Sequence, residues 1–183
     1  MKKTKLFIGA VSLATFLAGC AAFPGHVTET QSQLDGEQQV QVQPGYLYLK
    51  GLESASFKVG GFWSDKDPQD FVLEVAYMGV ASLKSLKVGI DGHVREFQPA
   101  HPTTDFEWEP DTGIAGVSAP SKAESRQRYI VPLAYVRQMV NGKRVVLQVQ
   151  LHDGVVEGVF SFDQQEYARP GFRRALEKIG SRP

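Results

Sequence analysis

The sequence predicts a mainly β protein: an antiparallel β-sandwich with two short helices, one of them C-terminal, after a signal peptide and a flexible tether. Beyond residue 38, apolar residues alternate with polar ones in short runs, which is the period of a half-buried strand. Turn sequences separate these runs, without the long helical crossovers that a parallel sheet needs. The 183 residues, 42% of them hydrophobic, fit one globular domain of ordinary size.

The first 20 residues have the order of a secretory signal. Lys2, Lys3 and Lys5 precede an apolar run over residues 6–17, and the segment contains no acidic residue. The run is too short to cross a bilayer as a helix, which takes roughly 20 residues. It ends in the sequence Leu-Ala-Gly-Cys, whose last residue is Cys20.

This Leu-Ala-Gly-Cys sequence resembles the lipobox of bacterial lipoproteins, and the resemblance covers residues 1–20. It implies that a signal peptide of residues 1–19 is removed and that Cys20 is diacylated and becomes the new N-terminus. Two or more acyl chains hold a protein stably on a membrane. The alternative is an ordinary secreted protein in which Cys20 is incidental. Because Ala21 follows instead of Asp, the resemblance implies the periplasmic face of the outer membrane in a Gram-negative host, and otherwise the cell membrane.

The composition narrows the function further. Cys20 is the single cysteine, so a lipidated chain has no free thiol for disulfides, cysteine catalysis, zinc–thiolate sites or iron–sulfur clusters. The 20 basic and 20 acidic side chains of the full sequence balance, which argues against a nucleic-acid binder.

The mature chain divides into two parts. Residues 20–37 are rich in Thr, Gln, Gly and Ser and predict a lipidated N-terminus with a tether. Residues 38–183 predict the sandwich domain. Its first feature is a hairpin in which Val42 pairs with Leu47 around the turn Pro44-Gly45.

Two Asp-Gly sequences predict later hairpins. Asp91-Gly92 follows an alternating strand, and a three-residue loop with a left-handed Gly92 would place Ile90 opposite Val94. Asp153-Gly154 joins the alternating segments 145–151 and 156–162 in the same way.

Two helices are also predicted. Pro132 opens the first, which ends at Asn141-Gly142, and the second follows Pro170. One apolar face of the first helix is formed by Leu133, Val136, Met139 and Val140. The second has Phe172, Leu176 and Ile179 at positions i, i+4 and i+7 and carries basic residues that are typical of a solvated face.

No coherent catalytic, metal or cofactor site is predicted. The sequence lacks H-E-x-x-H, G-x-S-x-G, S-x-x-K and phosphate-binding glycine patterns. An alternative is a metal site in which His93, His101 and His152 meet in the fold with Asp105 or Asp153.

The most informative segment for binding is residues 104–111. Strand alternation places Phe106 and Trp108 on one face and Asp105, Glu107 and Glu109 on the other. One interpretation is an edge strand whose aromatic residues are in the core and whose acids are in water. The other is a recognition strip of exposed aromatic residues with an acidic rim.

These observations predict a membrane-anchored envelope lipoprotein that is a non-enzymatic binding or assembly module for another envelope protein. One alternative is a cell-wall or glycan hydrolase that uses carboxylates such as Asp105, Glu107 and Asp153. Another is a domain that binds a small lipid or glycan in an apolar pocket.

Overall fold

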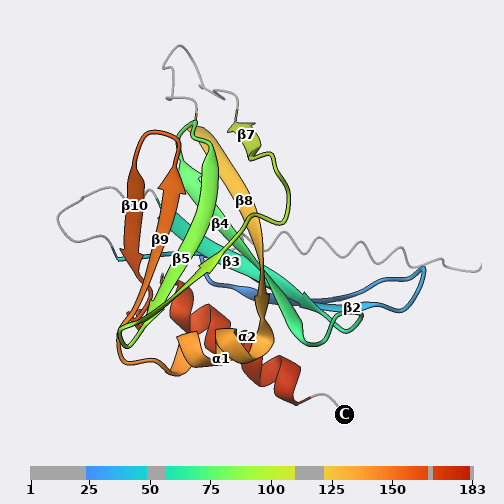
Figure 1. Ribbon diagram of the computed structural model, residues 1–183. Helices are drawn as coiled ribbons and strands as arrows, with labels where there is room; N and C mark the ends of the chain where they lie inside the picture. Colours follow the sequence, from blue (N-terminus) through green and yellow to red (C-terminus); the bar gives the residue numbers. More distant parts are fainter. Residues whose placement is uncertain (1–23, 49–56, 110–121, 165–166, 182–183) are drawn as a thin grey trace, which may run out of the picture.

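The computed structural model describes residues 24–48, 57–109, 122–164 and 167–181, with the backbone alone at residues 109 and 122. Within these ranges the protein is mainly β, and its strands form two antiparallel sheets with two helices, as predicted (Figure 1). The predicted signal peptide and Cys20 lie outside the described residues. No helix in the described ranges is long and apolar enough to span a bilayer.

The larger sheet has six strands in the order β1-β2-β3-β4-β8-β7, and the smaller has four in the order β10-β9-β5-β6. The strands of the larger sheet are β1 (Val27–Gln31), β2 (Gln38–Tyr46), β3 (Phe57–Ser64), β4 (Asp70–Met78), β7 (Asp105–Glu109) and β8 (Lys122–Pro132). Those of the smaller sheet are β5 (Leu83–Ile90), β6 (His93–Phe97), β9 (Val145–Leu151) and β10 (Val155–Val159).

One hydrophobic core fills the space between the sheets, and both sheets and both helices contribute to it. Isolated bridges join the sheets along two seams, one between Tyr48 and Val159 and one between Pro99 and Tyr129. The Tyr129 side chain is fully buried, and its hydroxyl donates a 2.6 Å hydrogen bond to the carbonyl oxygen of Lys84 in β5. Strands β1 and β7 are the two edges of the larger sheet.

The helices α1 (Leu133–Asn141) and α2 (Ala168–Gly180) lie together at one end of the sandwich (Figure 1). The four residues expected on the inner face of α1 are all buried, which confirms that prediction. Helix α2 begins at Ala168, so Pro170 lies in its first turn, where no backbone N–H is needed. Phe172 anchors α2 in the core, with its ring centroid 5.5 Å from that of Phe71 and 5.3 Å from that of Phe160.

The predicted tether boundary was wrong for residues 27–37. Strand β1 lies in this segment and pairs with β2 from Val27 opposite Val42. Its amino-terminal end is held by α2, because Arg174 donates a 2.8 Å hydrogen bond to the carbonyl oxygen of Gly25. Lys178 of α2 also forms an ion pair with Glu29 of β1. The polar segment 27–31 therefore forms a strand that is held by contacts with the C-terminal helix, which is distant in sequence.

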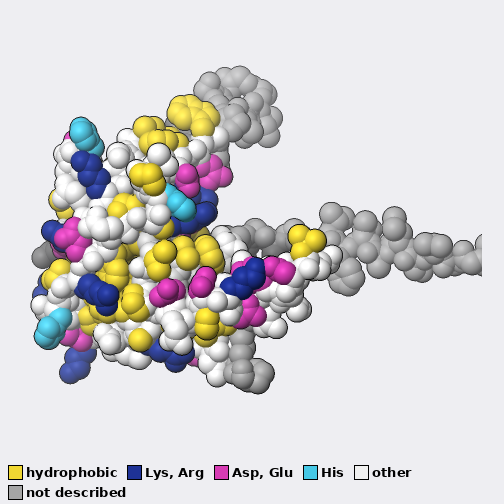
Figure 2. Space-filling view, turned by 45° about the vertical axis from the view of Figure 1, so that its right-hand side comes forward, with side chains coloured by type: hydrophobic (Ala, Val, Ile, Leu, Met, Phe, Trp, Pro, Cys, Tyr) yellow, Lys and Arg dark blue, Asp and Glu magenta, His cyan; other side chains and the backbone are white. Residues whose placement is uncertain are grey.

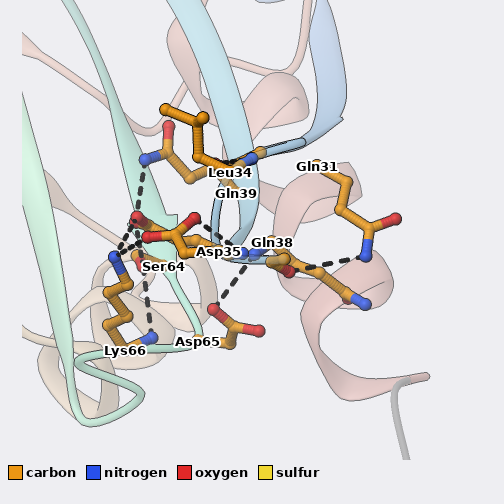
Figure 3. A network of polar contacts seen from close by, with 11 residues as sticks. Gln31, Leu34, Asp35, Gln38, Gln39, Ser64, Asp65 and Lys66 are labelled. Carbon is orange, nitrogen blue, oxygen red and sulfur yellow. Dashed lines mark hydrogen bonds and ion pairs between the residues drawn. The ribbon is translucent and has the colours of Figure 1, made fainter.

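A cluster of charged residues joins the β1–β2 turn to the β3–β4 turn (Figure 3). Lys66 forms ion pairs with Asp35 and Glu37, and Glu37 accepts a 2.6 Å hydrogen bond from the Ser64 hydroxyl. The hydrogen bonds from Ser64, Gln39 and Lys66 lower the pKa of Glu37 to about 2.

The predicted hairpin at Pro44-Gly45 was also wrong. Strand β2 passes through these residues to Tyr46, with an irregular register between Val42 and Gly45 where it pairs with β3. A β-carbon on Gly60 would lie 2.6 Å from the Val42 carbonyl oxygen and 2.7 Å from the Pro44 nitrogen. Because Gly60 has no side chain, β3 lies close enough to pair with β2 here, and β2 continues as a strand although Pro44-Gly45 locally favours a turn.

Both Asp-Gly hairpins are present. In the first, Ile90 pairs with His93, so the loop has two residues and the predicted pairing of Ile90 with Val94 was wrong. Asp91 and Gly92 have φ values of 50° and 92°, as a type I′ turn requires. In the second, Val156 lies opposite Val149, in the alternation that the sequence predicts.

Candidate functional site

The candidate site is strand β7, which forms one edge of the six-stranded sheet at the end away from the helices (Figure 1). Its residues pair in regular register with β8, from Asp105 opposite Arg126 to Glu109 opposite Lys122. In the described part of the chain, β8 is the single strand that pairs with β7.

The two aromatic residues of β7 are exposed to solvent. Phe106 is 59% exposed and Trp108 is 63% exposed, so the interpretation that places them in the core was wrong. They lie opposite Ser125 and Ala123, on the side of the sheet that faces the core elsewhere. Among the described helices and strands, β8 is the one that β7 contacts extensively, which agrees with the exposure of both rings.

We call Phe106 and Trp108 the aromatic strip. Figure 2 shows hydrophobic side chains at this end of the molecule, with acidic and basic side chains beside them. Val80, in the connection from β4 to β5, is 71% exposed, and the neighbouring Gly79 donates a backbone hydrogen bond of 2.8 Å to Ala123. Val80 is thus a further exposed apolar residue next to the contact with Ala123, which lies opposite Trp108.

The opposite face of β7 carries acids. Asp105 and Glu107 are both exposed there, as the alternation predicts. Glu109 holds the same face by register, and its side chain lies outside the described residues. Arg126 of β8 forms a 2.7 Å ion pair with Glu107 and another of 2.7 Å with Glu124.

These ion pairs continue across the outer face of the sheet. Glu124 also accepts a 3.1 Å hydrogen bond from Lys58 of β3. Burial opposes ionisation of Glu124, but the hydrogen bonds from Arg126 and Lys58 outweigh it and lower the pKa of its carboxyl group. The network borders an open depression of about 180 Å³, which is lined by Tyr46, Lys58, Met78, Glu107, Ala123, Glu124 and Arg126.

Two buried polar residues of β8 support the strip, and the sequence analysis did not identify them. The Ser125 side chain donates a 2.6 Å hydrogen bond to the Gly79 carbonyl oxygen and accepts one of 2.9 Å from the Ala81 N–H. The Gln127 amide donates to the carbonyl oxygens of His101 and Thr103, at 3.2 and 3.1 Å. The sequence signal that could have identified Ser125 and Gln127 is their position: they alternate along strand 122–132 with the same period as the apolar residues Tyr129 and Val131, and so face inward.

The entry into β7 is fixed by a further contact. The hydroxyl oxygen of Thr104, the residue before β7, accepts a 2.9 Å hydrogen bond from the Leu83 N–H at the start of β5. Together with the bonds made by Gln127, this contact attaches the segment before β7 to both sheets. The segment that leads into the aromatic strip is thus hydrogen-bonded to β5 and β8.

The alternative metal site does not assemble. Ile90 pairs with Val145 and Leu83 with Leu151, so the turns that carry His93 and His152 lie at opposite ends of the smaller sheet. Strands of this length separate their ends by about 20 Å. In the described ranges, no group of three His, Cys, Asp or Glu residues is arranged to hold a metal ion.

The carboxylates of the alternative hydrolase are placed in two sheets. Asp105 and Glu107 share the outer face of β7, where Glu107 is engaged by Arg126. Asp153 lies on the β9–β10 turn of the smaller sheet.

A scan against protein-family models and a search of curated proteins gave no match for this chain.

Proposed function

We propose that this protein is a lipid-anchored envelope lipoprotein whose β domain binds another envelope protein through the aromatic strip and catalyses no reaction. The observation that carries the proposal is the exposure of Phe106 and Trp108, 59% and 63%, on an edge strand. Most large apolar side chains of the described chain are buried in one core, so two adjacent exposed aromatic residues on one face need a reason.

Covering the strip would release substantial free energy. Aromatic side chains bury 150–250 Å² each, so covering the exposed parts of both rings removes roughly 200 Å² from water. At about 25 cal/mol per Å² this is about 5 kcal/mol before the entropy cost of association. Tryptophan is also among the residues that most often dominate binding energy at protein interfaces.

The anchor and the strip are compatible in position. With Cys20 as the anchor, the four residues to Pro24 span at most about 14 Å, so the domain is held close to the membrane surface. Strand β1, which follows Pro24, and β7 are opposite edges of the larger sheet. Five strand spacings separate them, about 24 Å along the sheet, which leaves the strip accessible to a partner.

The localisation is proposed from the sequence of residues 1–21. In a Gram-negative host we expect the domain on the periplasmic face of the outer membrane, and otherwise on the cell membrane. The test is the Cys20→Ala variant, expressed at the same level and followed by cell fractionation. Loss of the protein from the membrane fraction supports the anchor, and unchanged sedimentation with membranes contradicts it.

The binding proposal is tested by affinity capture from solubilised envelopes, with the full lipidated chain as bait. The comparison bait is the double variant Phe106→Ser/Trp108→Ser. The matched control is Val94→Ser, because Val94 is also apolar, is 69% exposed, and lies on β6 at an edge of the smaller sheet. We expect one discrete protein that is captured by the wild type and the control and lost with the double variant. Equal capture by all three baits, or no captured protein, would overturn the proposal.

A further inference from the structure

Strand β7 retains the geometry of a regular sheet edge. Its five pairs with β8 run without a register shift. In an antiparallel sheet, alternate residues of an edge strand direct their N–H and C=O groups away from the neighbouring strand. These groups form a template on which a further strand can pair.

Edge strands are usually protected, and β7 differs in this respect from β1 and β10. Strand β1 is clamped to α2 through Glu29 and Lys178. Strand β10 is bridged to the larger sheet through Val159 and Tyr48. The sequence of β7, Asp-Phe-Glu-Trp-Glu, contains no proline or lysine, the residues that commonly prevent edge pairing, and β7 has no bulge.

The strand that already pairs with β7 indicates what β7 accepts. Opposite the acidic face of β7, β8 places Arg126 facing Asp105, Glu124 facing Glu107 and Lys122 facing Glu109. Opposite its aromatic face β8 places the small residues Ser125 and Ala123. Arg126 forms ion pairs with both Glu107 and Glu124, so the two acids that lie opposite one another share a cation.

A second copy of β7 would be a poor partner. Antiparallel pairing centred on Glu107 would place Glu107 opposite itself and Asp105 opposite Glu109. Like charges directly opposite one another destabilise a sheet. In the fold, Arg126 bridges the opposed acids Glu107 and Glu124, but β7 contains no basic residue that could do the same for a second copy. The three acids of β7 therefore disfavour self-association and favour a cationic strand.

We propose that the partner adds a β-strand to β7, along the edge that pairs with no strand in the described ranges, and that this strand alternates basic residues with apolar ones. Its basic residues face Asp105, Glu107 and Glu109, and its apolar residues extend the aromatic strip. This inference rests on the proposed function, since it specifies how the same site binds. Main-chain hydrogen bonds supply affinity in this mode, and alternate side chains supply specificity.

The direct test uses two synthetic peptides, one with alternating lysine and valine and one with alternating glutamate and valine. The full lipidated chain is kept in detergent micelles and titrated while tryptophan fluorescence is recorded. We expect saturable binding of the lysine peptide and binding of the glutamate peptide that is weaker by tenfold or more, roughly the effect of reversing close charge pairs. Intermolecular NMR contacts should connect the bound peptide to the backbone of β7.

Charge reversal then tests the assignment of the face. The variant Asp105→Lys/Glu107→Lys should reverse the preference, so that the glutamate peptide binds better than the lysine peptide. The control is Glu157→Lys, because Glu157 is an exposed acid on β10, an edge strand of the smaller sheet, and this variant should keep the wild-type preference. Recovery of binding by the opposite peptide cannot arise from unfolding.

The outcomes separate this inference from the proposed function. Equal binding of both peptides, no saturable binding at millimolar peptide, or contacts at β1 instead of β7 would overturn strand addition. An envelope protein that still depended on Phe106 and Trp108 in the capture experiment would then leave the proposed function standing. Peptide binding at β7 without any captured envelope protein would support strand addition and contradict the proposed function.

Discussion

The Ser125 hydroxyl in β8 donates a 2.6 Å hydrogen bond to the carbonyl oxygen of Gly79, in the connection that carries the chain from the larger sheet to the smaller one. Ser125 is fully buried, and the Ala81 N–H donates to the same hydroxyl at 2.9 Å. One side chain therefore satisfies two backbone groups of a sheet-to-sheet connection directly beside Phe106.

Replacing Ser125 by alanine leaves both backbone groups without this partner. We expect Ser125→Ala to lower the free energy of unfolding by about 1–3 kcal/mol, the cost of unsatisfied buried polar groups. Urea denaturation measures this change. Ser82→Ala is the control, because Ser82 is an exposed residue of the same connection and its replacement should change stability by less than about 0.5 kcal/mol. Equal effects of the two variants would refute this role of Ser125.

Gly61 is predicted to be irreplaceable in β3. Its φ is 145°, and a β-carbon there would lie 2.1 Å from the Val72 carbonyl oxygen and 2.7 Å from the Phe71 ring. Because the oxygen belongs to the paired backbone of β4, Gly61→Ala should cost about 3 kcal/mol or more, through backbone strain and overpacking. Gly89→Ala in β5 is the control, since its nearest contact would be an ordinary 3.7 Å. Thermal unfolding by circular dichroism compares the two, and a Gly61→Ala variant as stable as the wild type would contradict the geometry.

The aromatic strip should contribute little to folding. We expect Phe106→Ser/Trp108→Ser to change the free energy of unfolding by about 0.5 kcal/mol or less per site, as exposed positions usually do. The contrast is Phe71→Ala, since Phe71 is fully buried and its truncation should cost about 3–5 kcal/mol. Guanidinium denaturation of both variants tests this difference. A double variant that unfolded as readily as Phe71→Ala would show that the strip belongs to the core.

Stability should decrease in acid because of the cluster around Lys66 (Figure 3). The pKa of Glu37 is lowered to about 2 by hydrogen bonds from Ser64, Gln39 and Lys66, and the Asp35 carboxyl pKa is lowered by Lys66, Ser32 and the Glu37 N–H. A carboxyl with a lower pKa in the folded state stabilises the fold above its unfolded pKa, which is near 4.5 for Glu37. This contribution is lost as the pH falls from about 4.5 toward 2.

The variant Glu37→Gln should therefore flatten the dependence of unfolding free energy on pH in that range. The measurement is urea denaturation at a series of pH values, with Glu96→Gln on the exposed strand β6 as the control. The effect should diminish at high salt, because the groups are solvent-accessible and screened. A Glu37→Gln profile parallel to that of the wild type would contradict a stabilising role of the cluster.

Local signals in the sequence were sufficient for several elements. Helix α1 was predicted with its boundaries and buried face, because Pro132, the apolar spacing and Asn141-Gly142 all act within a few residues. The Asp91-Gly92 and Asp153-Gly154 hairpins were also found, since their turns depend on a few adjacent residues. The alternation of residues 105–109 correctly divided aromatic from acidic side chains.

Tertiary structure decided which of these local preferences were realised. The turn signal at Pro44-Gly45 was overridden because glycines of β3 allow β2 to continue beside them. Strand β1 formed from a polar segment because α2, almost 150 residues later, holds Gly25 and Glu29. Neither contact has a signal in the segment itself.

The same distinction applies to the candidate site. The sequence by itself determined that Phe106 and Trp108 share one face of a strand, because alternation is a property of the backbone. Whether that face is buried depends on what covers it. Strand β7 lies at the edge of its sheet, and β8 is the one described helix or strand with which it makes extensive contact. The exposure of the strip, and its support by Ser125 and Gln127, are therefore properties of the assembled sheets.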